Sequence, residues 1–209
     1  MLVTYIILGV TVAVSLWALN DHSIMNRLIF NPYVVQVRKE WHRFLTHGFL
    51  HADYIHLFVN MYVLYGFGRI VEQLYVQHLG AGGRIAFVFM YLSSIIVASL
   101  SSYIKHKDHP GYNSLGASGA TSAVVFAFIL FAPWAKLSLL FIPIGIPGII
   151  MGVLYLVYSS YMAKRGGDNI GHDAHFYGAV YGFFYTLLLK PQLGQRFIEQ
   201  IGEGLGIRG

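Results

Sequence analysis

The chain has 209 residues, of which 56% are hydrophobic, 16% are aromatic and only 11% are charged. A soluble domain carries about 25% charged residues, so this composition predicts a polytopic membrane protein. The absence of cysteine excludes disulfides, thiol nucleophiles and iron–sulfur ligation, and any metal would need histidine or carboxylate ligands. The formal charge of +5 is spread over the loops, which favours contact with the lipid bilayer and its anionic head groups over binding of nucleic acid.

Six apolar runs predict an all-α membrane protein with six transmembrane helices, because a helix needs about 20 residues to cross the hydrocarbon core. The first run has no basic segment before it, so we expect a retained helix and not a cleaved signal peptide. The second and sixth runs are short, and we expect Arg69, Glu72 and Lys190 to complete them by reaching toward the head groups. No repeat or appended soluble segment is visible, so residues 1–209 are expected to form a single domain. The expected helices are residues 2–19, 54–71, 85–104, 117–133, 147–163 and 174–190.

The connections between these helices are expected to be structured. Residues 20–52 are too polar to span the membrane but rich in apolar side chains, which predicts an amphipathic loop in the interface. Pro147 suits the first turn of the fifth helix, so residues 137–146 before it are expected to form an extended connector. Residues 195–200 favour a short surface helix after the last span.

One serine lies at the head of the fourth expected helix. Ser118 stands in the sequence Gly116-Ala117-Ser118-Gly119-Ala120, where a polar loop enters an apolar run. These small neighbours leave the hydroxyl uncovered and let another helix approach closely. Small residues are also ordinary packing material in membrane helices, so this stretch by itself does not identify a site.

Polar side chains on three expected helices fall at one membrane level. With six spans, the second, fourth and sixth helices all enter the membrane from the same face. His56 and Asn60, spaced i and i+4, share one face near the start of the second helix. Ser118 begins the fourth helix, and His175 lies near the start of the sixth. Polar groups within spans are costly and indicate a functional site by default, so their common depth predicts a site shared by three helices.

A serine that meets a histidine in this way predicts nucleophilic catalysis. Ser118 would need an adjacent base, which His175 can supply as general base and acid. Gly178, on the same helical stripe as His175, would let the sixth helix lie close to the fourth. His56 and Asn60 would then donate hydrogen bonds to the oxyanion, together with the backbone N–H of Ser118.

Other polar residues nearby have structural explanations. Asp173 and His175 are two residues apart and face opposite ways on a helix, so we expect Asp173 to cap the sixth helix and not to complete a triad. His47 and His51 have the i, i+4 spacing of a metal pair, but no glutamate stands between them and no cysteine assists. Structural hydrogen bonds in the loop are therefore the favoured interpretation, and neither a metal nor another cofactor is expected. His172 is expected to be a loop residue.

Together these motifs resemble those of the rhomboid family of intramembrane serine proteases, over all six expected helices. The resemblance implies a six-transmembrane-helix rhomboid-like bundle that cleaves transmembrane segments of single-pass membrane proteins near the outer face by a Ser–His dyad. It also implies that Arg43 and its loop lie beside the bundle, in a cell-membrane protein whose termini face the cytoplasm. The motifs are His47-x-x-x-His51-x-x-x-x-His56-x-x-x-Asn60, Gly116-x-Ser118-Gly119 and Ala174-His175-x-x-Gly178-x-x-x-Gly182.

Two positions depart from the family pattern. His42 separates Trp41 from Arg43, which the family often places together. Ser122 stands one turn after the expected nucleophile, where the family often has an aromatic residue that stacks on the base. Neither departure removes a reacting group, but both bear on how rigidly His175 is oriented.

Three rival interpretations stay open at this point: a transporter with a His/Ser proton path, a bis-histidine haem protein, and a weakly active or inactive family member that only binds transmembrane clients. A transporter should show repeat symmetry and broken helices in both halves. Haem would need paired histidines deep within two helices. An inactive member should lack the serine or the histidine, and both are present, so the protease is the favoured hypothesis.

Overall fold

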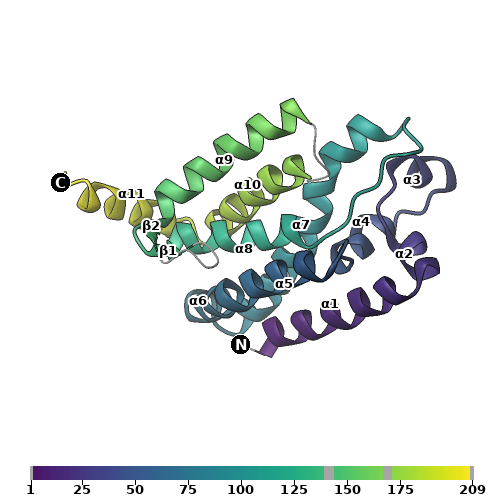
Figure 1. Ribbon diagram of the computed structural model, residues 1–209. Coiled ribbons are helices and arrows are strands. Elements are labelled where there is room, and N and C mark those ends of the chain that lie inside the picture. Colours follow the sequence, from purple (N-terminus) through teal and green to yellow (C-terminus); the bar gives the residue numbers. More distant parts are fainter. Residues whose placement is uncertain (1, 139–143, 167–170, 208–209) are drawn as a thin grey trace.

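The computed structural model of the protein describes residues 2–138, 144–166 and 171–207. In these ranges the chain is mostly helical, as predicted, and the long helices lie roughly side by side (Figure 1). The first long helix lies at one edge of the bundle and α9 at the other, with α8 between them (Figure 1).

In the part of the chain that the structure describes, six long helical segments occupy positions close to those predicted from the sequence. The second departs most, because it continues without interruption through a π-helical turn and ends at Leu79 instead of residue 71. Glycines with positive φ end two of the segments, Gly80 after the second and Gly166 after the fifth. The segments are α1 (Leu2–Asn20), α5 with η2 and α6 (Tyr54–Val63, Leu64–Gly68, Arg69–Leu79), α7 (Gly83–His106), α8 (Ser118–Phe131), α9 (Gly148–Arg165) and α10 (His172–Leu189).

Length and composition mark two helical stretches of the described chain as candidate membrane crossings, Leu2–Asn20 and Tyr54–His106. The second stretch contains α5 to α7, with the short 3-10 turn η3 (Gly80–Gly82) between α6 and α7. α8 is apolar but shorter than a typical span. The prediction of six spans therefore stays a prediction.

Residues 20–52 form the structured loop that the sequence predicts. Arg43 is buried in it and donates to the carbonyl oxygens of Asn26 at 2.8 Å and Ile29 at 2.7 Å. Its Nε atom donates to Glu40 at 2.7 Å, so the guanidinium joins residues 26–29 to the turn at Glu40. The loop elements are α2 (His22–Leu28), α3 (Pro32–Arg38), α4 (Arg43–Thr46) and η1 (His47–Phe49).

The contact between α8 and α10 is a backbone contact. A Cβ atom added at Gly178 would lie 2.1 Å from the carbonyl oxygen of Gly119, and one added at Gly182 would lie 2.1 Å from that of Ala123. Only glycine permits so close an approach of the two helices. α8 is buried along most of its length, which explains why it is apolar all round.

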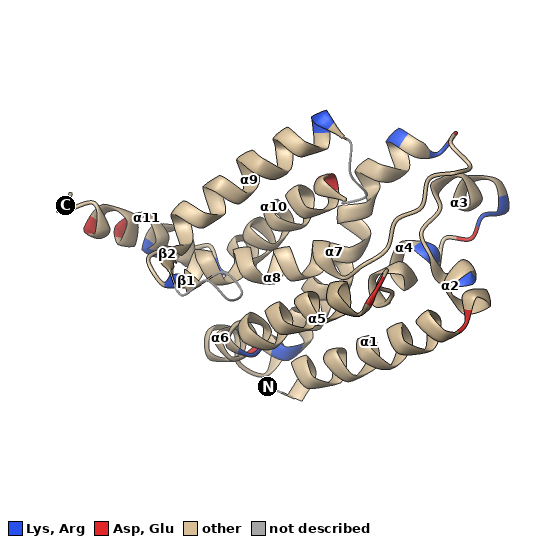
Figure 2. Ribbon diagram, viewed as in Figure 1, with Lys and Arg blue, Asp and Glu red and all other residues tan. Residues whose placement is uncertain are grey.

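The C-terminal part of the chain adds a short hairpin and a surface helix. β1 (Lys136–Ser138) and β2 (Gly145–Pro147) pair antiparallel, so the described parts of the predicted extended connector are extended, and residues 139–143 lie outside the described residues. The predicted helix after the last span is α11 (Gln192–Gly204). Charged residues gather at the two ends of the bundle and on the loops (Figure 2).

Glu72 contradicts the prediction that it reaches toward the head groups. Its side chain is fully buried and accepts hydrogen bonds from the backbone N–H groups of Val3 at 3.2 Å and Thr4 at 2.9 Å, and from the Thr4 hydroxyl at 2.8 Å. The first amides of a helix lack partners within the helix, and a carboxylate there is also favoured by the helix dipole. Glu72 therefore joins α6 to the start of α1.

We expect Glu72→Ala to lower the free energy of unfolding by about 3 kcal/mol, because it removes a buried carboxylate that satisfies three donors. Thermal unfolding in detergent micelles would measure the change. Glu199→Ala, on the exposed face of α11, is the matched control and should change stability by less than about 0.5 kcal/mol. A Glu72→Ala variant with the melting temperature of the wild type would show that the bonds of Glu72 do not stabilise the attachment of α1.

Candidate active site at the start of α8

Ser118 is the first residue of α8 and is half-buried. The segment before it turns at Gly116, where φ is 123°, a backbone conformation that favours glycine. The Gly116 N–H donates to the carbonyl oxygen of His47 at 3.0 Å, which ties the turn to the structured loop. The first amides of a helix have no intrahelical acceptor, so the N–H of Ser118 is suited to stabilise negative charge at this point.

His51 supports the same turn through its two ring nitrogens. Its Nδ1 atom lies 2.8 Å from the hydroxyl of Ser15, which itself donates to the carbonyl oxygen of Phe49 at 2.8 Å. The ring proton is therefore assigned to Nδ1, which leaves Nε2 to accept the N–H of Ala117 at 3.5 Å. Burial, and to a smaller extent the neighbouring His56, lower the pKa of His51 to about 3, so the ring is neutral at pH 7.

His47 is the other histidine of the candidate metal pair. Its Nε2 atom lies 2.8 Å from the hydroxyl of Ser99 on α7, and burial lowers its pKa to about 4. These bonds confirm the predicted structural role of both loop histidines. The described residues contain no group of three or more His, Asp or Glu side chains that could hold a metal ion.

His56 directs one edge of its ring at the turn before Ser118. A Cβ atom on Gly116 would lie 2.8 Å from Cε1 and 3.0 Å from Nε2 of His56. Asp53 caps α5 by accepting from the His56 N–H at 2.7 Å, and the Nδ1 atom of His56 accepts from the N–H of Ala52 at 3.4 Å. The proton of the neutral ring then sits on Nε2, so His56 presents an N–H donor to this segment.

Asn60 joins α5 to the first turn of α8. It is buried, its Nδ2 atom donates to the carbonyl oxygen of His56 at 3.0 Å, and its Oδ1 atom accepts from the hydroxyl of Thr121 at 3.2 Å. Thr121 also lies 3.1 Å from the carbonyl oxygen of Ser118. Asn60 is thus close to the predicted site, and its bond to Thr121 also serves helix packing.

His175 lies in the first turn of α10, three residues before Gly178. Because Gly178 touches the backbone of Gly119, α10 meets α8 at the residue directly after Ser118. A Cβ atom on Gly119 would also lie 3.4 Å from the carbonyl oxygen of Ala174. The glycine contact therefore holds the half-buried Ser118 and His175 at the same end of two touching helices.

Two predictions at the start of α10 are wrong. His172 is the first residue of the helix and is buried, with its ring edge-on to that of His175 at 5.9 Å, so it is not a loop residue. Asp173 is not the helix cap, which is Gly171. The helix begins two residues earlier than expected, and the carboxylate of Asp173 instead binds the ammonium group of Lys105 at 2.6 Å.

The sequence interpretation missed Tyr155 on α9. Its ring is nearly parallel to that of His175, with 6.1 Å between ring centroids and 19° between planes, and its hydroxyl lies 2.5 Å from that of Ser122. The sequence did contain a signal for it. Small residues recur at helical spacing in a stripe along one face of α9, which predicts that this face, including Tyr155, packs against the bundle. The stripe consists of Gly148, Gly152, Tyr155 and Ser159.

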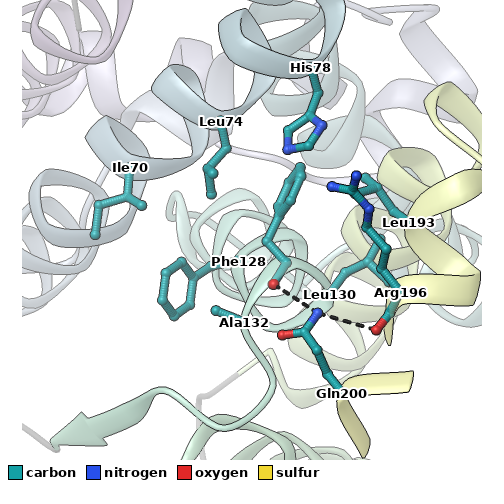
Figure 3. Close-up of a pocket in the computed structure, with 10 residues that line it drawn as sticks. Ile70, Leu74, His78, Phe128, Leu130, Ala132, Leu193, Arg196 and Gln200 are labelled. Carbon is teal, nitrogen blue, oxygen red and sulfur yellow. Dashed lines mark hydrogen bonds between the residues drawn. The ribbon is translucent and has the colours of Figure 1, made fainter. Parts of the chain in front are cut away.

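A cavity of about 290 Å³ lies elsewhere, between α6, α8 and α11. It opens beside the C-terminal end of α8, at Phe131 and Ala132, and its walls are mainly apolar (Figure 3). Gln200 donates to the carbonyl oxygens of Phe131 and Arg196, both at 3.3 Å, and these bonds join α11 to the bundle (Figure 3). The cavity is at the opposite end of α8 from Ser118, so it is not part of the candidate active site.

Residues 38–192 match the Rhomboid domain family, and the chain therefore belongs to the rhomboid family. The presenilin-associated rhomboid-like protein, mitochondrial, of Rattus norvegicus is 29% identical over 144 residues, which are 68% of this chain and 36% of that protein. The presenilin-associated rhomboid-like protein A, mitochondrial, of Danio rerio is 31% identical over 143 residues, which are 66% of this chain and 35% of that protein. Rhomboid-like protein 11, chloroplastic, of Arabidopsis thaliana is 28% identical over 183 residues, 82% of this chain and 61% of that protein.

These similarities support a membrane protein of the rhomboid family, which includes intramembrane serine proteases. The chain spans about a third of the length of the presenilin-associated relatives that it matches. The predicted location in the cell membrane, with cytoplasmic termini, is wrong: the relatives are named as mitochondrial or chloroplastic proteins. The prediction came from the family resemblance alone.

If Ser118 reacts as a nucleophile, Gly178→Ala should reduce its labelling about 100-fold, because the new methyl group would force α10 away from α8 by roughly 1 Å. The measurements are labelling of Ser118 by a fluorophosphonate probe and the melting temperature. Gly9→Ala, at a position on α1 with no atom within 4 Å of the added Cβ, is the matched control and should behave as the wild type. Equal labelling of both variants would mean that the glycine contact does not set the geometry of the site.

Proposed function

We propose that this protein is an intramembrane serine endopeptidase that cleaves transmembrane segments of single-pass membrane proteins. Residues 1–209 would act as one domain, with six helices crossing the bilayer. The observation that carries the proposal is the backbone contact of Gly178 with Gly119, which brings the helix of His175 against the helix that begins with Ser118. Membership of a family that includes such proteases supports the same activity.

In this proposal Ser118 and His175 act as a catalytic dyad. His175 takes the proton of the Ser118 hydroxyl as the oxygen attacks the carbonyl carbon of the scissile peptide bond. It then gives that proton to the leaving amine, and a water molecule activated by the same imidazole releases the acyl group from Ser118. No cofactor takes part in either step.

The oxyanion that forms during each attack needs hydrogen-bond donors. The N–H of Ser118 at the helix N-terminus and the Nε2–H of His56, beside Gly116, are the donors that the geometry favours. Asn60 is assigned the same role, with one of its amide hydrogens already bound to the carbonyl oxygen of His56. Donors held by helices in this way stabilise developing charge without having to reorganise.

The proposed substrates follow from where the dyad lies. Ser118 and His175 are at the ends of their helices and half-buried, so they would lie below a membrane surface and not above it. A transmembrane helix shields its peptide bonds by internal hydrogen bonding, so only a segment that unwinds near this surface can present a carbonyl to Ser118. Segments with glycine or proline near the cleaved bond should therefore be the best substrates.

A second candidate function is binding of transmembrane clients without cleavage, by a weakly active or inactive rhomboid-like protein. The bond between Asn60 and Thr121 favours it, because that bond gives Asn60 a structural use that needs no catalysis. The two functions differ in one measurable property, which is whether Ser118 is an activated nucleophile.

We expect Ser118→Ala to abolish labelling by a fluorophosphonate probe and cleavage of a transmembrane peptide in proteoliposomes. His175→Ala should lose nearly as much, and the double variant should be little worse than either single variant, because a dyad acts as a unit. Ser23→Ala, in the exposed loop, is the control for the probe and should label as the wild type. Additive losses would assign the base to another residue, with His172 the first to test, and absence of wild-type labelling would favour the binding function.

We expect His56→Ala and Asn60→Ala to lower kcat by at most about 10²–10³ with little change in KM, because oxyanion donors act mainly in the transition state. Thermal stability separates this role from packing. The lost bond between Asn60 and Thr121 should cost about 0.6 kcal/mol, whereas His56→Ala should change stability less. Lowered stability with an unchanged kcat would remove the residue concerned from the active site.

A further inference from the structure

Ser122 and Tyr155 form a bonded pair beside the proposed base. Ser122 stands one turn after Ser118 on α8 and is buried, and its hydroxyl lies 2.5 Å from the hydroxyl of Tyr155 on α9. The Tyr155 ring also packs against Phe126, with 5.8 Å between ring centroids. Two residues of α8 therefore hold Tyr155, Ser122 at its hydroxyl and Phe126 by a tilted ring contact.

The fixed ring of Tyr155 lies along the imidazole of His175. The centroids are 6.1 Å apart and the planes differ by 19°, which is an offset parallel arrangement. Aromatic pairs at such separations are attractive and have preferred orientations, so rotation of the imidazole about its side-chain bonds is restricted. A general base transfers a proton efficiently only when its nitrogen stays aligned with the nucleophile, so this restriction bears on the rate.

We propose that Tyr155 is the positioning residue of His175 and that Ser122 is its anchor on α8. The sequence suggested that the base lacks an aromatic neighbour, because serine occupies the position after the nucleophile. The structure assigns the aromatic ring to a different helix, with the serine holding that ring in place. This inference rests on the proposed function, in which His175 is the base.

One consequence concerns α9. Its outer face is exposed along most of its length, whereas Gly152 and Tyr155 face the bundle. A displacement of α9 away from α8 would break the bond to Ser122 and remove the ring from His175. α9 therefore carries part of the active site, although it contributes no reacting group.

Tyr155→Leu tests the ring and Tyr155→Phe tests the hydroxyl. Removal of the ring should lower kcat and the rate of Ser118 labelling by about 10- to 100-fold with KM little changed, because the base is then misaligned while the substrate still binds. Phenylalanine keeps the stacking surface, so Tyr155→Phe should lose only severalfold in rate, clearly less than Tyr155→Leu. Tyr161→Leu, an exposed tyrosine on the same helix, is the matched control and should leave both rates unchanged.

The anchor is tested by a double-mutant cycle. Ser122→Ala and Tyr155→Phe each remove one hydroxyl of the pair, so each should give the same severalfold loss, and the double variant should be no worse than either. All rates are measured well below the melting temperature of each variant, and Tyr155→Met replaces Tyr155→Leu if the leucine variant does not fold.

Three results would separate the possible failures. Wild-type kcat and labelling in Tyr155→Leu, together with complete loss in Ser118→Ala and His175→Ala, would overturn the positioning role alone. Equal losses in Tyr155→Leu and Tyr155→Phe would also overturn it, because the hydroxyl and not the ring would then be responsible. Activity retained in Ser118→Ala or His175→Ala would overturn the proposed function instead.

Discussion

The close approach of α8 and α10 is the constraint on which the rest of the structure depends. Two glycines of α10 lie against carbonyl oxygens of α8, at distances that leave no room for a side chain. Helices in a membrane gain nothing from hiding apolar surface from lipid, so close packing and hydrogen bonds must hold them together. One of the two glycine contacts lies directly beside Ser118, so the same contact serves both the fold and the site.

The structured loop of residues 20–52 holds the turn before α8 in place. His47 fixes Gly116 through its backbone, and His51 accepts the N–H of Ala117 through its ring. Both rings are bound in turn by serines of neighbouring helices, Ser99 and Ser15. A buried polar group costs free energy unless it is hydrogen-bonded, and the bonds named here also hold the backbone of the turn that leads to Ser118.

Three helices other than α8 contribute to the candidate site. α5 supplies His56 and Asn60, α10 supplies His175, and α9 supplies Tyr155. The side chains that support these residues lie further along the same helices or on α8, as Thr121 and Ser122 do. The site is therefore formed between helices, and small displacements of one helix against another change its geometry without altering any helix internally.

Much of this fold could be predicted from the sequence, because apolar runs and residue spacings are properties of short stretches of chain. Apolar runs placed the long helices within a few residues, apart from the end of the second, and the spacing of Ser118, His175, His56 and Asn60 indicated one level in the bundle. Glu72 was misjudged because its charge predicted exposure, whereas burial became possible once the start of α1 supplied three donors. The start of α10 was misplaced by two residues because no side-chain cap marks it.

Tertiary structure alone decided the contacts between residues far apart in the chain. The sequence gives no means to know that Lys105 binds Asp173, or that Ser122 meets Tyr155, because side chains on different helices are brought together by helix rotation and offset. Those two quantities are set by packing over the whole length of each helix. The sequence by itself thus determined which helices form and which polar groups share a level, while the tertiary structure decided which of those groups touch.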